Sequence, residues 1–199
     1  MASTGEKDLD STEYAYRRAW GPTARIAART RLTKAIGQHD GLLNVAEAAA
    51  TVVCQELSAR TVTVTLLQNE VYRDLVKVGN YSADEQIDPS ESFPASLYPE
   101  ATARLLAQQA YVSSEQIPDI EREHLQIVSP DMVSAFMGVP IVADGEVRGE
   151  IFATRRAGEP PFTDDDVDVA RDFATQLGSQ FPRLLAQPLD DDPPATSRT

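Results

Sequence analysis

The sequence predicts an α+β domain, in which a central antiparallel sheet carries the terminal helices on one face and a ligand-pocket segment on the other. Three observations support this prediction. Apolar residues recur every three or four positions near both ends of the chain, strictly alternating β-branched residues follow the second helical segment, and two more alternating segments flank an Asp-Gly turn. The length of 199 residues fits one domain with additional terminal segments.

Two helices are expected before the first strand. Residues 13–38 favour a helix that is interrupted at Gly21-Pro22, because proline lacks a backbone N–H and disfavours helix in the residue before it. Residues 42–57 have the broad apolar stripe of a core-facing helix. The first helix has a narrower apolar stripe, which comprises Ile26, Leu32 and Ile36.

The first predicted hairpin comprises residues 60–67 and 70–78, joined at Gln68-Asn69. Alternation with period two in β-branched residues is typical of a strand with two different faces. In the first strand the alternating sets are Val62, Val64 and Leu66 on one side and Thr61, Thr63 and Thr65 on the other.

The middle of the chain predicts less regular structure. Residues 82–94 contain two prolines and several acids and are expected to form a loop. A short helix is expected at residues 98–109 and a short strand at 110–113, whereas residues 114–131 are expected to be mostly irregular.

The second hairpin is predicted at residues 132–142 and 146–154, around a tight Asp-Gly turn. Thr163 is expected to cap the last helix, which has three aspartates in its first turn and an apolar stripe to about residue 185. Strand alternation places two sets of side chains on opposite faces of residues 132–142. Val133, Ala135, Met137 and Val139 are expected to face the helices, and Ser134, Phe136 and Gly138 the pocket, together with the threonines of the first strand.

The charge pattern excludes some partners. A net charge of −13 argues against nucleic acid, because phosphate binding relies on clustered basic residues. Six of the 18 basic residues lie between Arg17 and Lys34, and acidic residues cluster in 164–172. These two segments are expected either to pair across a dimer or to be separate solvated helix faces.

Cysteine content and hydropathy restrict the possible chemistry and location of the chain further. Cys54 is alone, which excludes an intramolecular disulfide and a cysteine zinc cluster, and its apolar surroundings favour a buried, inert thiol. The sequence contains no apolar run long enough to cross a membrane, and residues 1–11 do not resemble a signal peptide. A cytoplasmic protein without a membrane partner is therefore expected.

Three segments in order resemble the GAF domain family. They are residues 134–141 (Ser-Ala-Phe-Met-Gly-Val-Pro-Ile), 145–151 (Gly-Glu-Val-Arg-Gly-Glu-Ile) and 162–166 (Phe-Thr-Asp-Asp-Asp). The resemblance implies a GAF domain at residues 40–187, after a helical segment at 13–39. The terminal segments 1–12 and 188–199 are expected to be disordered.

The resemblance also allows known GAF chemistries to be compared residue by residue. Sulfoxide reduction and bilin attachment in this family use cysteines, which Cys54 alone does not match. The cyclic-nucleotide pattern is only partly present, although it implies a structural ion pair between Arg156 and Asp166. Haem-binding relatives have a histidine where this chain has Pro130, so haem remains an alternative only through His124.

These features predict a non-catalytic sensory domain that binds an unknown small molecule and acts as a homodimer, with no metal and no obvious cofactor. The pocket residues predicted from their mixed aromatic and polar character are Phe93, Tyr98, Tyr111, His124, Ser134 and Phe136. The dimer is expected through the terminal helices, because Phe181 and Leu184 extend past the expected core. The alternatives are an interaction module with a self-filled pocket, which signals through a partner protein, and a haem-based gas or redox sensor.

Overall fold

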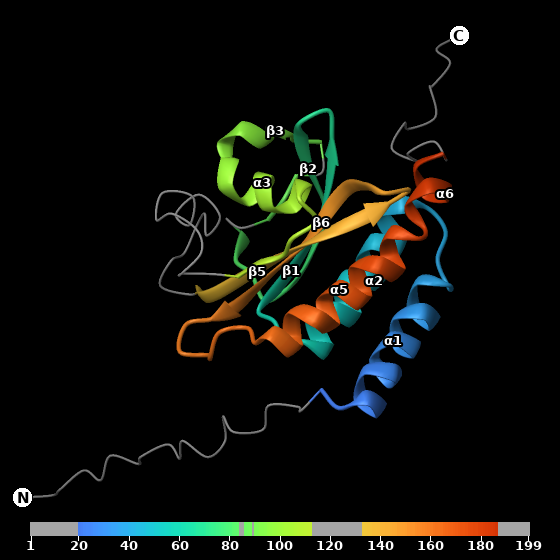
Figure 1. Ribbon diagram of the computed structural model, residues 1–199, viewed down its shortest axis with the longest axis vertical. Coiled ribbons are helices and arrows are strands. Elements are labelled where there is room, and N and C mark those ends of the chain that lie inside the picture. The colour runs from blue at the N-terminus through green and yellow to red at the C-terminus, as the bar shows by residue number, and fades with distance from the viewer. Residues whose placement is uncertain (1–19, 84–85, 89, 113–132, 187–199) are drawn as a thin grey trace, which may run out of the picture.

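The computed structural model describes residues 20–83, 86–88, 90–112 and 133–186 (Figure 1). Within these residues the chain forms a six-stranded sheet in the order β3-β2-β1-β6-β5-β4, and every neighbouring pair is antiparallel. This confirms the predicted α+β class. The strands are β1 (Thr61–Gln68), β2 (Val71–Gly79), β3 (Phe93–Pro94), β4 (Tyr111–Val112), β5 (Val133–Ala143) and β6 (Glu146–Arg156).

Helices cover the two faces of the sheet unequally (Figure 1). α2 (Leu42–Glu56) and α5 (Asp164–Gly178) pack on one face, and α1 (Pro22–Ile36) lies outside them as a further layer. α3 (Pro99–Leu106) packs on the other face, after the short 3₁₀ turn η3 (Ala95–Leu97). No helix in the described part of the chain is long and apolar enough to cross a bilayer.

The interruption at Gly21-Pro22 is where α1 begins, with Pro22 in its first turn. Leu32 and Ile36 are buried as predicted, but Ile26 is 65% exposed. The buried stripe of α1 instead begins at Ala28. Ile26 lies two residues earlier, and because each helical residue turns by about 100°, its side chain points about 200° away from that of Ala28.

The last helix is shorter than predicted. α5 ends at Gly178, and a separate turn, α6 (Phe181–Leu185), follows. Pro182 has no N–H to donate to the carbonyl four residues before it, so the helix cannot continue unbroken. Phe181 and Leu184 are 0% and 1% exposed within a single chain, so the expectation that they need a second surface to cover them is wrong.

The basic and acidic terminal helices pair within one chain. Arg25 of α1 lies 2.7 Å from the Asp165 carboxylate and 3.8 Å from that of Asp168, both on α5. These are exposed ion pairs and contribute on the order of 1 kcal/mol or less each. Arg25 thus pairs with the acidic helix within one chain, an arrangement that neither expectation included, and the two aspartates remain 63% and 50% exposed.

The resemblance implied an ion pair between Asp166 and Arg156. In the structure Asp166 instead forms its buried ion pair with Arg155. Thr154 of the same strand faces the pocket, so alternation turns the next residue, Arg155, toward the helices. The Arg155 guanidinium also stacks 4.5 Å from the centre of the Phe162 ring.

Two separate apolar clusters fill the two sides of the sheet. The larger lies beneath the terminal helices and includes Ala135, Met137 and Val139. The smaller lies on the α3 side and includes Tyr111 and Phe136, whose rings are 6.5 Å apart. The predicted assignment of faces is therefore confirmed for these residues, and Phe136 does not pack beneath α5.

The first residues of β5 depart from that assignment. A bulge between Val133 and Ala135 leaves Ser134 as an extra residue opposite β6. The bulge returns Val133 to the pocket side, where it lines the cavity, contrary to the prediction that it faces the helices.

Candidate ligand pocket

A cavity of about 270 Å³ lies on the face of the sheet that α3 covers. Its floor is a set of side chains arranged in rows across β2, β1 and β6, because residues opposite one another on adjacent strands point to the same face. One row is Asp74, Thr65 and Glu150, the next is Lys77, Thr63 and Phe152, and the last is Thr61 and Thr154.

A bulge in β2 makes this arrangement possible. Val64 pairs with Val76 while Thr65 pairs with Asp74, so Leu75 is the extra residue. Leu75 packs in the helix-side core, whereas Asp74 and Lys77, three positions apart, both line the cavity. Regular alternation would have placed Asp74 and Lys77 on opposite faces.

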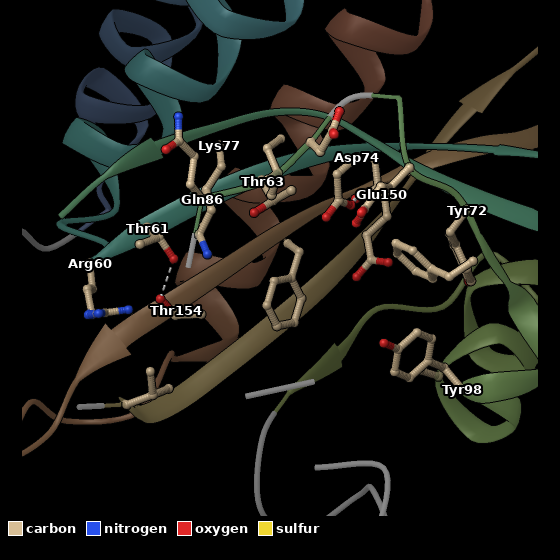
Figure 2. Close-up of a pocket in the computed structure, with 18 of the residues that line it drawn as sticks. Arg60, Thr61, Thr63, Tyr72, Asp74, Lys77, Gln86, Tyr98, Glu150 and Thr154 are labelled. Carbon is tan, nitrogen blue, oxygen red and sulfur yellow. Dashed lines mark hydrogen bonds between the residues drawn. The ribbon is translucent and has the colours of Figure 1, made fainter. Parts of the chain in front are cut away.

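Two carboxyl groups meet at the centre of the floor (Figure 2). Asp74 accepts a 2.7 Å hydrogen bond from the Thr65 hydroxyl, and Glu150 accepts one from the Tyr111 hydroxyl. Gly138 permits the second contact, since a Cβ on it would lie 2.2 Å from both the Glu150 carboxyl and the Tyr111 ring. The space above Gly138, expected to be open to a ligand, is thus filled by the protein itself.

Burial makes both carboxyl groups weaker acids than they are in water. It raises the pKa of Glu150 from its ordinary value of 4.5 to about 8, against the hydrogen bond from Tyr111 and with the help of the Asp74 charge. Burial also raises the pKa of Asp74, which the Thr65 hydrogen bond and the Lys77 charge oppose. The pKa of the Tyr98 hydroxyl is raised by burial and by the charges of both carboxylates. Tyr98 therefore lies within electrostatic reach of the pair.

Aromatic rings form one end of the cavity (Figure 2). Tyr72 and Phe93 stack with centroids 5.7 Å apart, and Tyr98 meets Phe93 edge to face at 5.7 Å. The Tyr72 hydroxyl lies 3.0 Å from that of Thr102 on α3, which fixes the ring against the helix. This end of the cavity is therefore an aromatic wall.

The opposite end is polar. The Thr61 and Thr154 hydroxyls lie 2.6 Å apart, and Arg60 is drawn beside them in Figure 2. Arg60 is held there by its backbone, which donates to the Thr154 carbonyl at 2.7 Å. The cavity therefore changes from hydroxyl-rich and basic, through the two carboxyl groups, to aromatic.

Of the six pocket residues predicted from sequence, Phe93, Tyr98 and Tyr111 line the cavity. Phe136 is on the predicted face but fully buried against Tyr111 and Phe152, so it packs beside the floor and does not line the cavity. Ser134, the bulge residue, is exposed and donates to the backbone carbonyls of Arg156 and Glu159 at 2.5 and 2.9 Å. His124 lies outside the described residues.

Sequence reasoning missed the charged residues of the floor, which are Arg60, Asp74, Lys77 and Glu150. A signal for Glu150 was present, because it alternates with Phe152 and Thr154 on the strand that follows the Asp-Gly turn. Asp74 and Lys77 carried no such signal, since only the bulge brings both to this face.

Comparison with known families gives one match. The model of the GAF domain matches residues 41–181, close to the 40–187 expected from the motifs. None of the curated proteins compared with the chain matches it.

Several solved structures share the fold. The chromophore-binding domain of a bacteriophytochrome from Stigmatella aurantiaca is 15% identical with a TM-score of 0.66, over 84% of this chain and 63% of that one. The GAF domain of a phosphoenolpyruvate-protein phosphotransferase from Coxiella burnetii is 12% identical with a TM-score of 0.65, over 82% and 96%. The phycocyanobilin-bound GAF domain of a cyanobacterial phytochrome is 14% identical with a TM-score of 0.65, over 81% and 96%. This chain thus spans less than two thirds of the bacteriophytochrome fragment, and identities this low show the fold alone.

Proposed function

Since the chain belongs to the GAF domain family, we propose that it is a non-catalytic sensory or regulatory module that binds a compact small molecule in the pocket above β1, β2 and β6. Ligand pockets in proteins are usually preformed hollows with apolar walls and a few convergent polar groups. This cavity has that character, with Tyr72, Phe93 and Tyr98 as walls and Asp74 and Glu150 as the polar groups.

The cavity itself is the observation that carries the proposal. A module that serves only for protein contacts would fill this space with its own side chains. About 270 Å³ is instead open between polar and aromatic residues, at the lower end of the roughly 300–1,000 Å³ typical of ligand pockets. The size favours a compact ligand over a tetrapyrrole.

The lining also bears on the pigments that related structures contain. Two neighbours are described as binding a chromophore or phycocyanobilin. In this chain Cys54 is on α2 and packs against the helix-side core, on the opposite face of the sheet from the cavity. A covalent bilin at this cysteine does not fit, and burial raises the pKa of its thiol, which agrees with the inert role expected.

Haem receives no support from the described lining, which has no histidine, cysteine or methionine to bind iron.

Homodimer formation is a separate part of the proposal. It is supported by Ile26, which lies on the outer surface of α1 and is 65% exposed, whereas Phe181 and Leu184 are covered within the chain. Light scattering at tens of micromolar tests it directly, and a monomeric mass would contradict it. A cytoplasmic location and a signalling partner belong to the same proposal.

Native mass spectrometry of the purified chain, followed by thermal-shift screening of fractionated metabolites, tests ligand binding. A compound bound in the pocket should raise the melting temperature of the wild type but not that of Thr63→Phe, which places a ring at the centre of the floor. Circular dichroism checks that this variant is folded. If every stabilising compound acts equally on both proteins, the pocket is not the ligand site.

A further inference from the structure

We infer that the ligand is a compact aromatic compound with a positively charged amine, and that the amine binds between the carboxyl groups of Asp74 and Glu150. The inference rests on the proposed function, because it names the ligand class for the same pocket.

The charge of the lining favours a cation. Within the described residues it contains four carboxyl groups and two basic groups. Asp74 and Glu150 flank Thr65 on the floor, whereas Arg60 is at the far end (Figure 2). A carboxylate or phosphate at the centre would face the Asp74 charge and would keep Glu150 protonated, whereas a cation is attracted by Asp74 and favours ionisation of Glu150.

Two oxygen atoms at the centre have room for a donor. Among the described residues, Glu150 accepts one side-chain hydrogen bond, from Tyr111 to Oε1, and Asp74 accepts one, from Thr65 to Oδ1. Glu150 Oε2 and Asp74 Oδ2 receive none from the described residues. Neither oxygen is among the buried polar atoms that lack a partner, and both side chains line the cavity, so both oxygens are open to it. An ammonium group has three donors and can bond to both oxygens.

The aromatic wall adjoins this pair. Tyr72, Phe93 and Tyr98 line the same cavity as the two carboxyl groups, and the charges of both carboxyl groups raise the pKa of the Tyr98 hydroxyl. Ring faces attract cations, and the same rings provide an apolar surface for a flat ligand. In an amine attached to an aromatic ring by a short linker, the ammonium group can bind the two carboxyl groups while the ring packs against the aromatic wall.

Binding of the amine should release a proton from Glu150 to the solvent. With a pKa of about 8, this carboxyl group holds about nine-tenths of a proton at pH 7 when the pocket is empty. Two titratable groups act on it directly, Asp74 on β2 and Tyr111 on β4, while Lys77 on β2 acts on Asp74, and Tyr98 before α3 is acted on by both carboxyl groups. A cation favours the ionised carboxylate, and so the proton leaves as the amine enters.

Isothermal titration calorimetry of the full chain tests the inference with three probes of similar shape. These are 2-phenylethylamine, the uncharged 2-phenylethanol and the anionic 3-phenylpropionate. We expect the amine to bind at least tenfold more tightly than either analogue. Titrations in two buffers of different ionisation enthalpy should show release of close to one proton at pH 7, and the amine affinity should rise about fivefold from pH 7 to 8.

Isosteric variants separate the contribution of each carboxyl group. Glu150→Gln and Asp74→Asn should each weaken amine binding at least tenfold, and Glu150→Gln should also abolish proton release. Glu47→Gln, an exposed change on α2 at the other face of the sheet, should leave binding within twofold. Circular dichroism of each variant verifies folding.

The inference is overturned if the amine fails to bind, or if the alcohol or the acid binds as tightly. It is also overturned if the compound retained in native mass spectrometry is neutral or anionic, an outcome that leaves the proposed function intact. If no compound distinguishes the wild type from Thr63→Phe, the proposed function fails as well.

Discussion

Asp166, in the first turn of α5, forms a buried ion pair with Arg155 at the end of β6, with Nη2 and Oδ2 3.2 Å apart. The two residues are each 7% exposed. The other carboxylate oxygen of Asp166 accepts a 2.9 Å hydrogen bond from the Trp20 indole. One side chain therefore connects the sheet, the last long helix and the segment before α1.

Asp166→Asn should strongly destabilise the fold. The change removes the Asp166 charge from the buried Arg155 guanidinium, and breaking a buried ion pair typically costs about 3–5 kcal/mol. Urea unfolding gives the difference in the free energy of unfolding. Asp164→Asn, an exposed change in the same helical turn, is the control and should stay within about 0.5 kcal/mol of wild type.

Thr163→Ala should destabilise the start of α5 by about 0.5–2 kcal/mol. The Thr163 hydroxyl accepts from the Asp166 backbone N–H at 3.2 Å, and the Asp166 carboxylate accepts from the Thr163 N–H at 3.0 Å. Thr163→Ser keeps the hydroxyl and should retain most of the stability. An alanine variant with an unchanged unfolding midpoint would show that the cap contributes nothing.

Gly138→Ala should disturb the pocket floor at its centre. The added methyl group would meet the Glu150 carboxyl and the Tyr111 ring, and relieving such overpacking typically costs about 1–3 kcal/mol. The tyrosine fluorescence and the melting temperature should both change. Gly158→Ala is not a suitable control, because Gly158 has a positive φ. Gly21→Ala is the control, because a methyl group on Gly21 would meet no atom within 4 Å and the φ of Gly21 is −69°.

Glu150 should make stability fall as the pH rises. Its pKa is 4.5 when unperturbed and about 8 in the folded chain, so between these values the folded state retains a proton that the unfolded state has released. The free energy of unfolding therefore decreases over this range, by up to about 1.4 kcal/mol per pH unit. Urea unfolding at pH 5, 6, 7 and 8 measures the slope.

Glu150→Gln removes the titrating group and should flatten this pH dependence. The stability of the variant relative to the wild type should therefore increase toward pH 8. Glu146→Gln, an exposed change on the same strand, should preserve the wild-type slope. Equal slopes in wild type and Glu150→Gln would mean that Glu150 is ionised like an exposed carboxyl group.

Local patterns in the sequence were sufficient for the fold. The alternating threonines of residues 61–65, the Asp-Gly turn and the capping Thr163 each depend on neighbours a few residues away, and the structure contains all three. The motifs at 134–166 identified the resemblance to the GAF domain family, which the match at 41–181 confirms. Phe93, Tyr98 and Tyr111 were predicted from their mixed aromatic and polar character, and all three line the cavity.

Only the tertiary structure decided where charge lies in the pocket. The bulges at Leu75 and Ser134 each insert one residue, which reverses the face of every side chain on one side of it. The first bulge brings Asp74 and Lys77 onto one face, and the second removes Ser134 from the pocket and admits Val133. Neither bulge has a marker in the sequence, because each follows from how one strand fits against its partner and the layers above and below it.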